Sequence, residues 1–199
     1  MLKVNKQSEP DFFTKFKNKE KPKSWSDYNK HRIKQELREF MINNEQDGYC
    51  PYCEQLITSS NEKSHIEHIK PKGGKYASLF QNYENLITCC STNGICGNAK
   101  KDYYDDKFIN VVNENPEDLL TYDISTGKIV PIYEEGIEHK RAIYTIELLN
   151  LNDIRLVDLR KKFIWELNYL EEEDLIYFIE NKDINFIGLV NFFKKEFFE

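Results

Sequence analysis

Apolar side chains recur every three or four residues in the first quarter of the chain and predict an amphipathic helix. The positions that carry this repeat are Ile33, Leu37, Phe40, Met41 and Asn44. Either Ser24 or Ser26 is available as its N-cap, and Gly48 ends it. Residues 1 to about 24 are polar and include two prolines, so we expect an extended arm before this helix.

A module bracketed by cysteines follows, from Tyr49 to about Tyr104. Residues 64–70 predict a short strand, 71–74 a turn and 98–104 a short helix. Since the candidate reactive side chains fall between these elements, this module is expected to carry the chemistry of the protein.

Beyond the module the pattern becomes mainly helical. Residues 119–124 and 128–132 flank Ser125-Thr126-Gly127 and predict a β-hairpin. The segments expected to form helices are 137–150, 153–170 and 174–198. The fold class is therefore α+β and mainly helical. It has three expected parts, namely a basic arm and helix at 1–48, the cysteine-bracketed module at 49–110, and a hairpin with helices at 111–199.

Composition is that of a globular protein, because 199 residues with 40% hydrophobic and 14% aromatic content suffice to bury a core. The sequence shows no positively charged leader followed by an apolar stretch. It also has no run near the roughly 20 apolar residues that a membrane span needs. We therefore expect a cytoplasmic protein without membrane contact.

The net charge of −6 is unevenly distributed, and only the first 40 residues, here called the basic front, carry excess positive charge. Residues 1–40 carry 11 Lys and Arg against 6 Asp and Glu, residues 41–110 carry 7 against 9, and residues 111–199 carry 10 against 19. The front could bind nucleic-acid phosphates together with lysines of the module, whereas the acidic remainder would be repelled by them. Those lysines are Lys70, Lys72, Lys75, Lys100 and Lys101. Solvated helix faces explain any single charge run equally well.

Four of the five cysteines form two pairs that suit a zinc site. Cys50 and Cys53 make a Cys-x-x-Cys knuckle, and Cys90 and Cys96 make a looser second pair. Zinc takes four donors, with thiolates at about 2.3 Å, and an odd number of cysteines argues against a disulfide framework. Neighbouring side chains usually point apart, so only one of Cys89 and Cys90 should bind. We choose Cys90 and assign Cys89 to the core.

The run Cys50-Pro51-Tyr52-Cys53 is also the redox motif of glutaredoxins. In that fold it follows a buried strand and opens a helix whose N-terminus lowers the thiol pKa. Here it follows a predicted helix, and residues 54–58 after it resemble a strand. A redox role would also leave the second cysteine pair without function, so structural zinc is preferred.

His65, Glu67 and His68 lie close together between the cysteine pairs. Histidine supplies a base with a pKa near neutrality, glutamate a hard oxygen ligand, and a divalent ion beside both can activate water. Strand alternation puts His65 and Glu67 on one face and His68 on the other, so Glu67 and His68 converge only if the strand bends. His31 and His139 lie on predicted helices without neighbouring chemistry and receive no role.

Three motifs resemble those of HNH nucleases of the ββα-metal type, in which two short strands and a helix hold one divalent ion. They are Ile66-Glu67-His68-Ile69-x-Pro71, Asn85-Leu86 and Cys96-x-Asn98-x-x-Lys101. Most of the chain is also similar to the HNH proteins of Septu and retron anti-phage defence operons. That wider resemblance rests on the Pro- and Lys-containing arm, Gln46-x-Gly48-Tyr49-Cys50-x-Tyr52-Cys53-Glu54, His65-Ile66-Glu67-His68, and Leu149-Asn150-Leu151-Asn152 followed by Arg160.

The resemblance implies a nuclease site and two kinds of metal. It implies His68 as general base toward the attacking water, Glu67 as metal ligand, and Asn85 as a residue that either orients the site or contacts the ion. Asn98 departs from the family, because it stands where many members have a last histidine; its amide oxygen can ligate a hard cation but cannot protonate a leaving group. His65 is implied as an outer ligand or its partner. Zinc would hold the frame, and Mg²⁺ or Mn²⁺ would perform the chemistry.

The resemblance further implies a bacterial protein that acts on nucleic acid, with DNA favoured over RNA, and an ATPase partner of the SMC-like or ABC-like type. Apolar residues of the C-terminal third exceed what a small nuclease module needs to bury, so this region is expected to dock the partner. The candidates are Phe192, Phe193, Phe197 and Phe198. A helical core could equally take most of them.

Two other functions stay open at this point. One is a non-catalytic zinc module that binds nucleic acid or protein, and the other is a glutaredoxin-like thiol enzyme. The first shares the zinc site with a nuclease but needs no base, whereas the second needs only the first cysteine pair.

Overall fold

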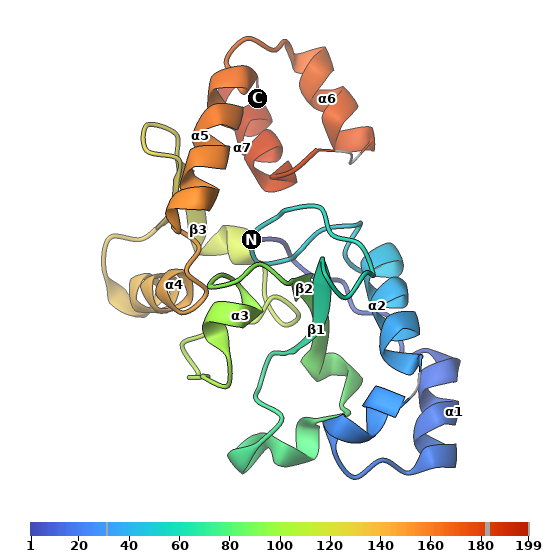
Figure 1. Cartoon of the computed structure of the whole chain (residues 1–199). Helices are drawn as coiled ribbons and strands as arrows, with labels where there is room; N and C mark the ends of the chain where they lie inside the picture. Colours follow the sequence, from blue (N-terminus) through green and yellow to red (C-terminus); the bar gives the residue numbers. More distant parts are fainter. Residues whose placement is uncertain (31, 182–183, 199) are drawn as a thin grey trace.

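The computed structural model describes residues 1–30, 32–181 and 184–198. His31, to which the sequence gives no role, lies outside the described residues. Figure 1 shows a two-stranded hairpin near the middle of the molecule, with the N-terminal helices at one end and the last three helices at the other.

The N-terminal region is partly helical, so the expected extended arm is wrong. Helix α1 spans Asp11–Glu20, a 3-10 helix spans Trp25–Lys30, and α2 spans Ile33–Asn44. Pro10 is the N-cap of α1, with φ −67° and ψ 141°, and a proline at the start of a helix costs no backbone hydrogen bond. Phe13 of α1 is fully buried in the same core as α2, an anchor that the polar composition of the segment conceals.

Helix α2 is the predicted amphipathic helix, but it begins later than expected. Its N-cap is Arg32 and not a serine. The carboxylate of Asp27 instead accepts the backbone N–H of Ser24 at 3.0 Å, which closes a separate turn. Leu37 and Met41 are fully buried, as the periodicity predicts.

The cysteine-bracketed module contains a small antiparallel sheet. Strand β1 (Ser64–His68) pairs with β2 (Leu86–Cys90), and the register aligns the first residue of β1 with the last residue of β2. Two 3-10 helices, Gly74–Leu79 and Tyr83–Asn85, lie between the strands. The expected short helix is α3 (Gly97–Lys100), a single turn after β2.

The strand-like segment at 54–58 does not join a sheet. It makes only an isolated bridge between Tyr49 and Leu56. That bridge closes the two ends of the turn that holds the first cysteine pair, so the segment completes a knuckle and adds no strand to the hairpin.

The predicted β-hairpin is confirmed and is the second hairpin of the structure. Strands β3 (Leu120–Asp123) and β4 (Lys128–Pro131) pair antiparallel around the Ser125-Thr126-Gly127 turn. Helices α4 (Gly136–Leu148) and α5 (Ile154–Leu167) follow close to their expected bounds.

The last segment forms two helices and not the single one expected at 174–198. They are α6 (Glu172–Asn181) and α7 (Ile187–Phe197). Phe186, directly before α7, has φ +62°, a left-handed conformation that an uninterrupted helix does not allow. Its backbone N–H donates to the carbonyl oxygen of Glu54 at 2.8 Å, so the break is anchored to the cysteine module.

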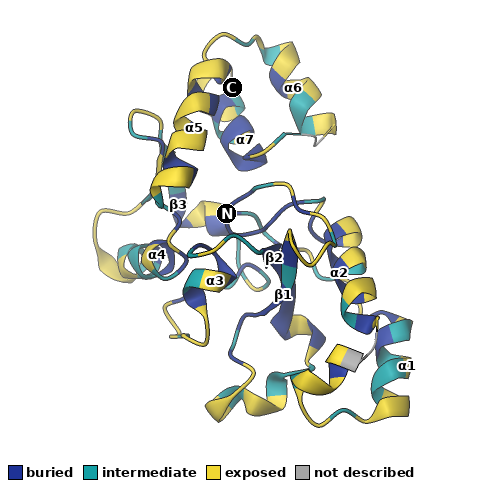
Figure 2. Ribbon diagram, viewed as in Figure 1, coloured by how far each residue is buried: buried dark blue, intermediate teal, exposed yellow. Residues whose placement is uncertain are grey.

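Two hydrophobic cores hold the molecule together. The larger one contains the cysteines and the inner faces of α4 to α7. The smaller one joins α1 and α2 to one face of the β1–β2 hairpin, mainly through Phe13, Tyr28, Leu37, Met41 and Leu86. Figure 2 shows the β1–β2 hairpin as largely buried and the outer face of α5 as exposed. The hairpin therefore lies between the cores.

A buried arginine connects the C-terminal half to this arrangement. Arg160 is fully buried, and its guanidinium donates to the carbonyl oxygens of Gly127 at 2.7 Å and Leu151 at 2.8 Å. In the same segment the carbonyl oxygen of Leu149 accepts the backbone N–H of Cys96 at 2.8 Å. The Leu-Asn-Leu-Asn element and Arg160 thus support the second hairpin and the start of α3.

The class is α+β with small sheets, as the sequence predicts. The helices of the described residues are too short or too polar to cross a bilayer.

Candidate metal centres and active site

The four predicted zinc ligands form one cluster. The Sγ atoms of Cys50 and Cys96 are 3.8 Å apart, and those of Cys53 and Cys90 are 3.7 Å apart. All four side chains are buried, and the four sulfur atoms lie within 4.8 Å of one another. A tetrahedral zinc ion with bonds of about 2.3 Å has sulfur–sulfur edges of about 3.8 Å. The cluster therefore fits zinc as it stands.

Three parts of the chain meet at this cluster. Cys50 and Cys53 lie in the turn after α2, Cys90 ends β2, and Cys96 directly precedes α3. The backbone N–H of Cys50 donates to the carbonyl oxygen of Gln55 at 2.8 Å and closes the turn. All five cysteines are free, and within the described residues no helix begins at this turn. The setting differs from the strand-to-helix position of a glutaredoxin motif.

Cys89 belongs to a different group of side chains. Alternation along β2 turns it away from Cys90, and its register partner across the hairpin is His65. The Sγ atom of Cys89 lies 3.4 Å from Nε2 of His65, and Oε2 of Glu67 lies 3.8 Å from the same nitrogen. These three donor atoms lie within 4.8 Å of one another. The cysteine that the sequence assigns to the core thus faces two of the predicted site residues.

Glu67 has a different neighbour for each carboxylate oxygen. Its Oε1 accepts a hydrogen bond from Nζ of Lys100 at 2.7 Å, while Oε2 faces His65. Burial raises the pKa of Glu67, but the adjacent imidazole of His65 and the charge of Lys100 together outweigh burial, so that the pKa is lowered. The carboxylate is therefore ionised at neutral pH.

His68 ends β1 and lies on the other face of the strand. Its Nε2 is 3.0 Å from the carbonyl oxygen of Phe80, and its ring packs edge-on against Trp25 with centroids 4.6 Å apart. A carbonyl oxygen only accepts, so Nε2 carries the proton and Nδ1 the lone pair. Burial, aided by the charge of Lys72, lowers the pKa of His68 to about 4, which keeps the ring neutral at neutral pH.

Asn85 fixes the course of the chain beyond β1. Its Oδ1 accepts the backbone N–H of Lys70 at 2.8 Å, and its Nδ2 donates to the carbonyl oxygen of Lys70 at 2.9 Å. The carbonyl oxygen of Asn85 also accepts the backbone N–H of Ile69 at 3.0 Å. The side chain is buried. Its contacts orient the segment that follows His68.

The two polar residues of α3 have opposite environments. Asn98 is exposed, and its Nδ2 donates to the carbonyl oxygen of Thr92 at 3.2 Å. Lys100 is fully buried, pairs with Glu67 and donates to the carbonyl oxygen of His68 at 2.9 Å. The expected phosphate contact of Lys100 is therefore wrong.

One pocket of about 470 Å³ opens beside these groups. The predicted site residues that line it are His65, Glu67, His68 and Asn98. Both faces of β1 reach it, because His68 is the last residue of the strand and the following Pro71 forms part of the wall. Lys72 and Lys101, which are exposed, add positive charge to its lining.

Positive charge continues from this pocket to α2. Burial and the nearby charges of Lys72 and Arg38 lower the pKa of Lys34. The ammonium of Lys34 lies 4.7 Å from the ring centre of Trp25, which itself packs on His68. The basic front of the sequence therefore lies next to the candidate site.

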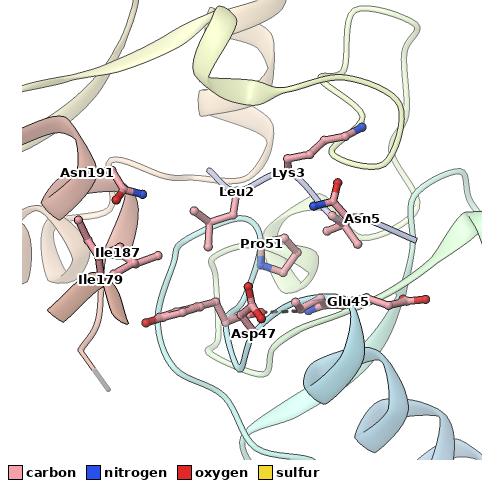
Figure 3. Close-up of a pocket in the computed structure, with 12 residues that line it drawn as sticks. Leu2, Lys3, Asn5, Glu45, Asp47, Pro51, Ile179, Ile187 and Asn191 are labelled. Carbon is pink, nitrogen blue, oxygen red and sulfur yellow. Dashed lines mark hydrogen bonds between the residues drawn. The ribbon is translucent and has the colours of Figure 1, made fainter. Parts of the chain in front are cut away.

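A separate pocket of about 210 Å³ lies between the N-terminal segment and α6 and α7 (Figure 3). Its apolar wall includes Leu2, Pro51, Ile179 and Ile187. The carboxylate of Glu45 beside it is already engaged by Nζ of Lys6 at 2.7 Å. None of the predicted site residues, all of which the structure describes, lines this pocket, so it is not part of the candidate site.

Sequence reasoning missed three contributors to the site. They are Cys89, Gly97 and Lys100, whose side chains or backbone surround Glu67. The pairing of His65 with Cys89 would have identified Cys89, had the second strand been placed opposite the first. Lys100 carried no distinguishing signal, because a buried lysine and an exposed one look alike in sequence.

No family model matches the sequence. The chain is similar to "Retron Ec83 putative HNH endonuclease" of Escherichia coli, with 26% identity over 220 residues that cover 87% of this chain and 83% of that protein. It is also similar to "Retron Vc95 putative HNH endonuclease" of Vibrio cholerae serotype O1 biovar El Tor, with 34% identity over 128 residues. That alignment covers 61% of this chain and 60% of the Vibrio protein. The two names agree with the retron part of the resemblance found in the sequence.

Proposed function

We propose that the chain is a metal-dependent HNH endonuclease of the retron type, which hydrolyses phosphodiester bonds in nucleic acid. The main support is one arrangement, in which Glu67 and His68 at the end of β1 open to a single pocket beside α3 and the four-cysteine cluster. The similarity to two retron proteins named as HNH endonucleases agrees with it. In this proposal β1, β2 and α3 are the ββα-metal core of the 49–110 module, between the parts at 1–48 and 111–199.

His68 is the proposed general base. Because its Nε2 donates to the carbonyl oxygen of Phe80, its Nδ1 is the atom that removes a proton from the attacking water. The edge contact with Trp25 limits rotation of the ring. Asn85 is a positioning residue. It hydrogen-bonds to the backbone of Lys70 and thereby holds the bend after the strand.

Glu67 is the proposed ligand of a divalent ion, with Asn98 as a second ligand and His65 as an outer partner. Such an ion, expected from the resemblance to be Mg²⁺ or Mn²⁺, would polarise the scissile phosphate and neutralise charge on the leaving oxygen. The donors fit a hard ion only in part. Oε1 of Glu67 is taken by Lys100, and Oε2 faces an imidazole and a thiol and not further oxygen atoms.

The substrate would approach over the basic surface around the pocket. Lys72 and Lys101 line the pocket, and Lys34 lies near Lys72. Cations in this arrangement can pair with the phosphates on either side of the scissile bond. DNA is the favoured substrate, and anti-phage defence within a retron is the proposed setting.

The C-terminal helices are the proposed docking surface for a protein partner, which the resemblance suggests is an ATPase of the SMC-like or ABC-like type. Trp165 and Tyr169 are both exposed and pack edge-on against each other with centroids 5.0 Å apart. Of the predicted phenylalanines, Phe197 is exposed, whereas Phe193 is buried in the core. The exposed rings support a contact surface, and Phe193 leaves the list of candidates.

Cleavage of DNA and RNA by the full chain, alone and with the proposed ATPase partner, tests the proposal. His68→Ala is expected to lower cleavage by about 100-fold or more, since a positioned general base contributes about 10²- to 10⁴-fold. Zinc content should stay unchanged, because His68 is not a member of the four-cysteine cluster. The matched control is His139→Ala on α4, outside the pocket, which should cleave like the wild type.

Undiminished cleavage by His68→Ala protein would overturn the assignment of the base. Nucleic-acid binding without cleavage under every metal would favour the non-catalytic zinc module. Loss of ATPase binding in Trp165→Ala protein, with cleavage of the isolated chain retained, is the expected result for the docking surface.

A further inference from the structure

We propose that His65, Glu67 and Cys89 bind a second metal ion of the zinc class in the pocket beside α3. The inference specifies the metal of the proposed nuclease site, and in that respect it rests on the proposed function. Its test is metal content, which can be measured whether or not the protein cleaves nucleic acid.

The three donor atoms are spaced as ligands of one ion would be. Nε2 of His65 lies 3.4 Å from Sγ of Cys89 and 3.8 Å from Oε2 of Glu67. A tetrahedral ion with bonds of about 2.0 to 2.3 Å has ligand–ligand edges of about 3.3 to 3.8 Å. The nitrogen–sulfur separation falls within this range, the nitrogen–oxygen separation lies at its upper end, and all three donor atoms lie within 4.8 Å of one another.

Gly97 leaves the space in which the donors converge. A Cβ atom on this glycine would stand 2.7 Å from Oε2 of Glu67, 2.8 Å from Sγ of Cys89 and 2.8 Å from Nε2 of His65. The backbone of Gly97 does not adopt the left-handed conformation that would by itself require glycine. What the missing side chain provides here is room between three ligand atoms.

The ring of His65 is turned so that its lone pair can face this space. The hydroxyl of Ser91 donates to the carbonyl oxygen of Asn61 and lies 3.4 Å from Nδ1 of His65. Because the hydroxyl proton of Ser91 is donated to Asn61, the Ser91 oxygen can act only as an acceptor toward His65. In that tautomer Nδ1 of His65 carries the proton and Nε2 carries the lone pair. A hydrogen bond from the outer nitrogen is the usual way in which proteins orient a metal-binding imidazole.

Lys100 limits Glu67 to one available oxygen. Its ammonium occupies Oε1 at 2.7 Å, so the carboxylate can bind an ion only through Oε2. The same ammonium is a fixed positive charge beside a carboxylate and a thiol. With a divalent ion bound, the thiolate and the carboxylate reduce the charge of the site, Lys100 included, to +1, and Lys100 does not have to leave for the ion to bind.

The donor set selects the class of metal. A thiolate and an imidazole favour zinc and similar transition ions, whereas Mg²⁺ requires oxygen ligands. Three protein ligands leave a fourth position for water or a phosphate oxygen, which is the arrangement of catalytic zinc sites. His65 and Glu67 line the 470 Å³ pocket, so that position is reachable from solvent.

Metal analysis of the purified full chain after zinc loading is the first experiment. The wild type is expected to hold two zinc ions, one in each group of ligands. Cys89→Ser, His65→Ala and Gly97→Ala should each hold one, because they remove a donor or fill the space. The matched control is Asn93→Ala, an exposed residue that lines the same pocket, which should keep both ions.

Cobalt provides a second readout that does not depend on stoichiometry. Protein that keeps zinc in the four-cysteine cluster is titrated with Co²⁺, and thiolate-to-cobalt absorption is expected in the wild type and absent in Cys89→Ser. Excess Mg²⁺ should not remove this absorption of the wild type. His65→Ala is the safeguard against misfolding, because this side chain is partly exposed and its loss leaves the core intact.

A wild type that holds a single zinc ion after loading would overturn the inference. Two ions that persist in both the Cys89→Ser and His65→Ala variants would overturn it as well. The proposed nuclease function can fail separately, since a protein with two zinc ions and no cleavage under any condition would refute only that function.

Discussion

Lys100 and Glu67 form an ion pair in the interior of the protein, with Nζ 2.7 Å from Oε1. The side chain of Lys100 is 0% exposed and that of Glu67 is 8% exposed. The same ammonium donates to the carbonyl oxygen of His68 at 2.9 Å. The single turn of α3 is thereby attached to the end of β1, and one side chain contacts both residues proposed for catalysis.

Removal of this ammonium is expected to destabilise the protein. Lys100→Met leaves the carboxylate of Glu67 buried without its partner, which typically costs about 3 to 5 kcal/mol. Urea denaturation measures the loss. Lys101→Met is the matched control, because its side chain is exposed one residue away and should change stability by less than about 0.5 kcal/mol.

The double variant Lys100→Met with Glu67→Gln tests whether the two side chains stabilise the protein through their interaction. It should recover part of the stability lost in Lys100→Met, because no buried charge then remains unpaired. Additive losses in the double variant would show that the two side chains act independently and would contradict the pairing.

Extraction of zinc from the four-cysteine cluster is expected to unfold the centre of the molecule. The cluster joins the turn after α2 to β2 and α3, and structural zinc contributes folding free energy of about 10 kcal/mol or more in small zinc domains. A strong chelator should abolish the near-ultraviolet circular dichroism and lower the melting temperature. Cys89→Ser protein, with an intact four-cysteine cluster, serves as the comparison and should lose the same near-ultraviolet signal on chelation. An unchanged melting curve after complete zinc removal would refute the structural role.

The two asparagines of the candidate site should respond differently to substitution. Asn85→Ala leaves a backbone N–H and a carbonyl of Lys70 without partners and is expected to cost about 1 to 3 kcal/mol. Asn98→Ala removes an exposed side chain and should cost less than about 0.5 kcal/mol. Urea denaturation compares them directly. Equal losses would mean that Asn85 does not hold the bend after β1.

Asp153, the N-cap of α5, makes stability depend on pH. Its carboxylate accepts the backbone N–H of Arg155 at 3.0 Å and pairs with the guanidinium at 2.7 Å, and the same guanidinium donates to the carbonyl oxygen of Asn93 at 2.9 Å. The side-chain hydrogen bond with Arg155 is the largest cause, and together these contacts lower the pKa of Asp153 to about 2. Because the unfolded pKa is about 3.9, the charge stabilises the fold above about pH 4, and this contribution disappears as the pH falls toward 2.

Asp153→Asn isolates this charge, since asparagine keeps an oxygen for capping α5. The wild type should exceed the variant in unfolding free energy by about 1 kcal/mol or less near pH 6, after solvent screening. The difference should shrink steadily between about pH 5 and 2.5 in a series of urea titrations. A difference that does not vary with pH would show that the charge of Asp153 contributes nothing.

Local sequence signals predict those elements whose causes are local. The β3–β4 hairpin follows from the Ser125-Thr126-Gly127 turn, and α4 and α5 follow from their periodicity. Helix α1 was missed because prolines at its borders were interpreted as breakers, although Pro10 is compatible with a helix start. The break before α7 depends on the contact of Phe186 with Glu54, more than one hundred residues away in the chain.

The same distinction between local and long-range causes applies to the candidate site. Spacing suggests the four-cysteine cluster, because a Cys-x-x-Cys knuckle followed by a second cysteine pair is typical of structural zinc sites. The environment of Cys89 depends on strand register, and that of Lys100 on the packing of α3 against β1. Both are long-range facts, which a single sequence does not contain.

The hydrogen bond from Cys96 to Leu149 has a consequence for the newly made protein. A ribosome completes the cysteines and histidines of the pocket well before it reaches Leu149 and the buried Arg160 that supports that segment. Until then the last thiol of the cluster lacks its backbone anchor. A chain truncated near residue 110 would carry every reactive group of the site but would lack the carbonyl oxygen that holds the backbone of Cys96.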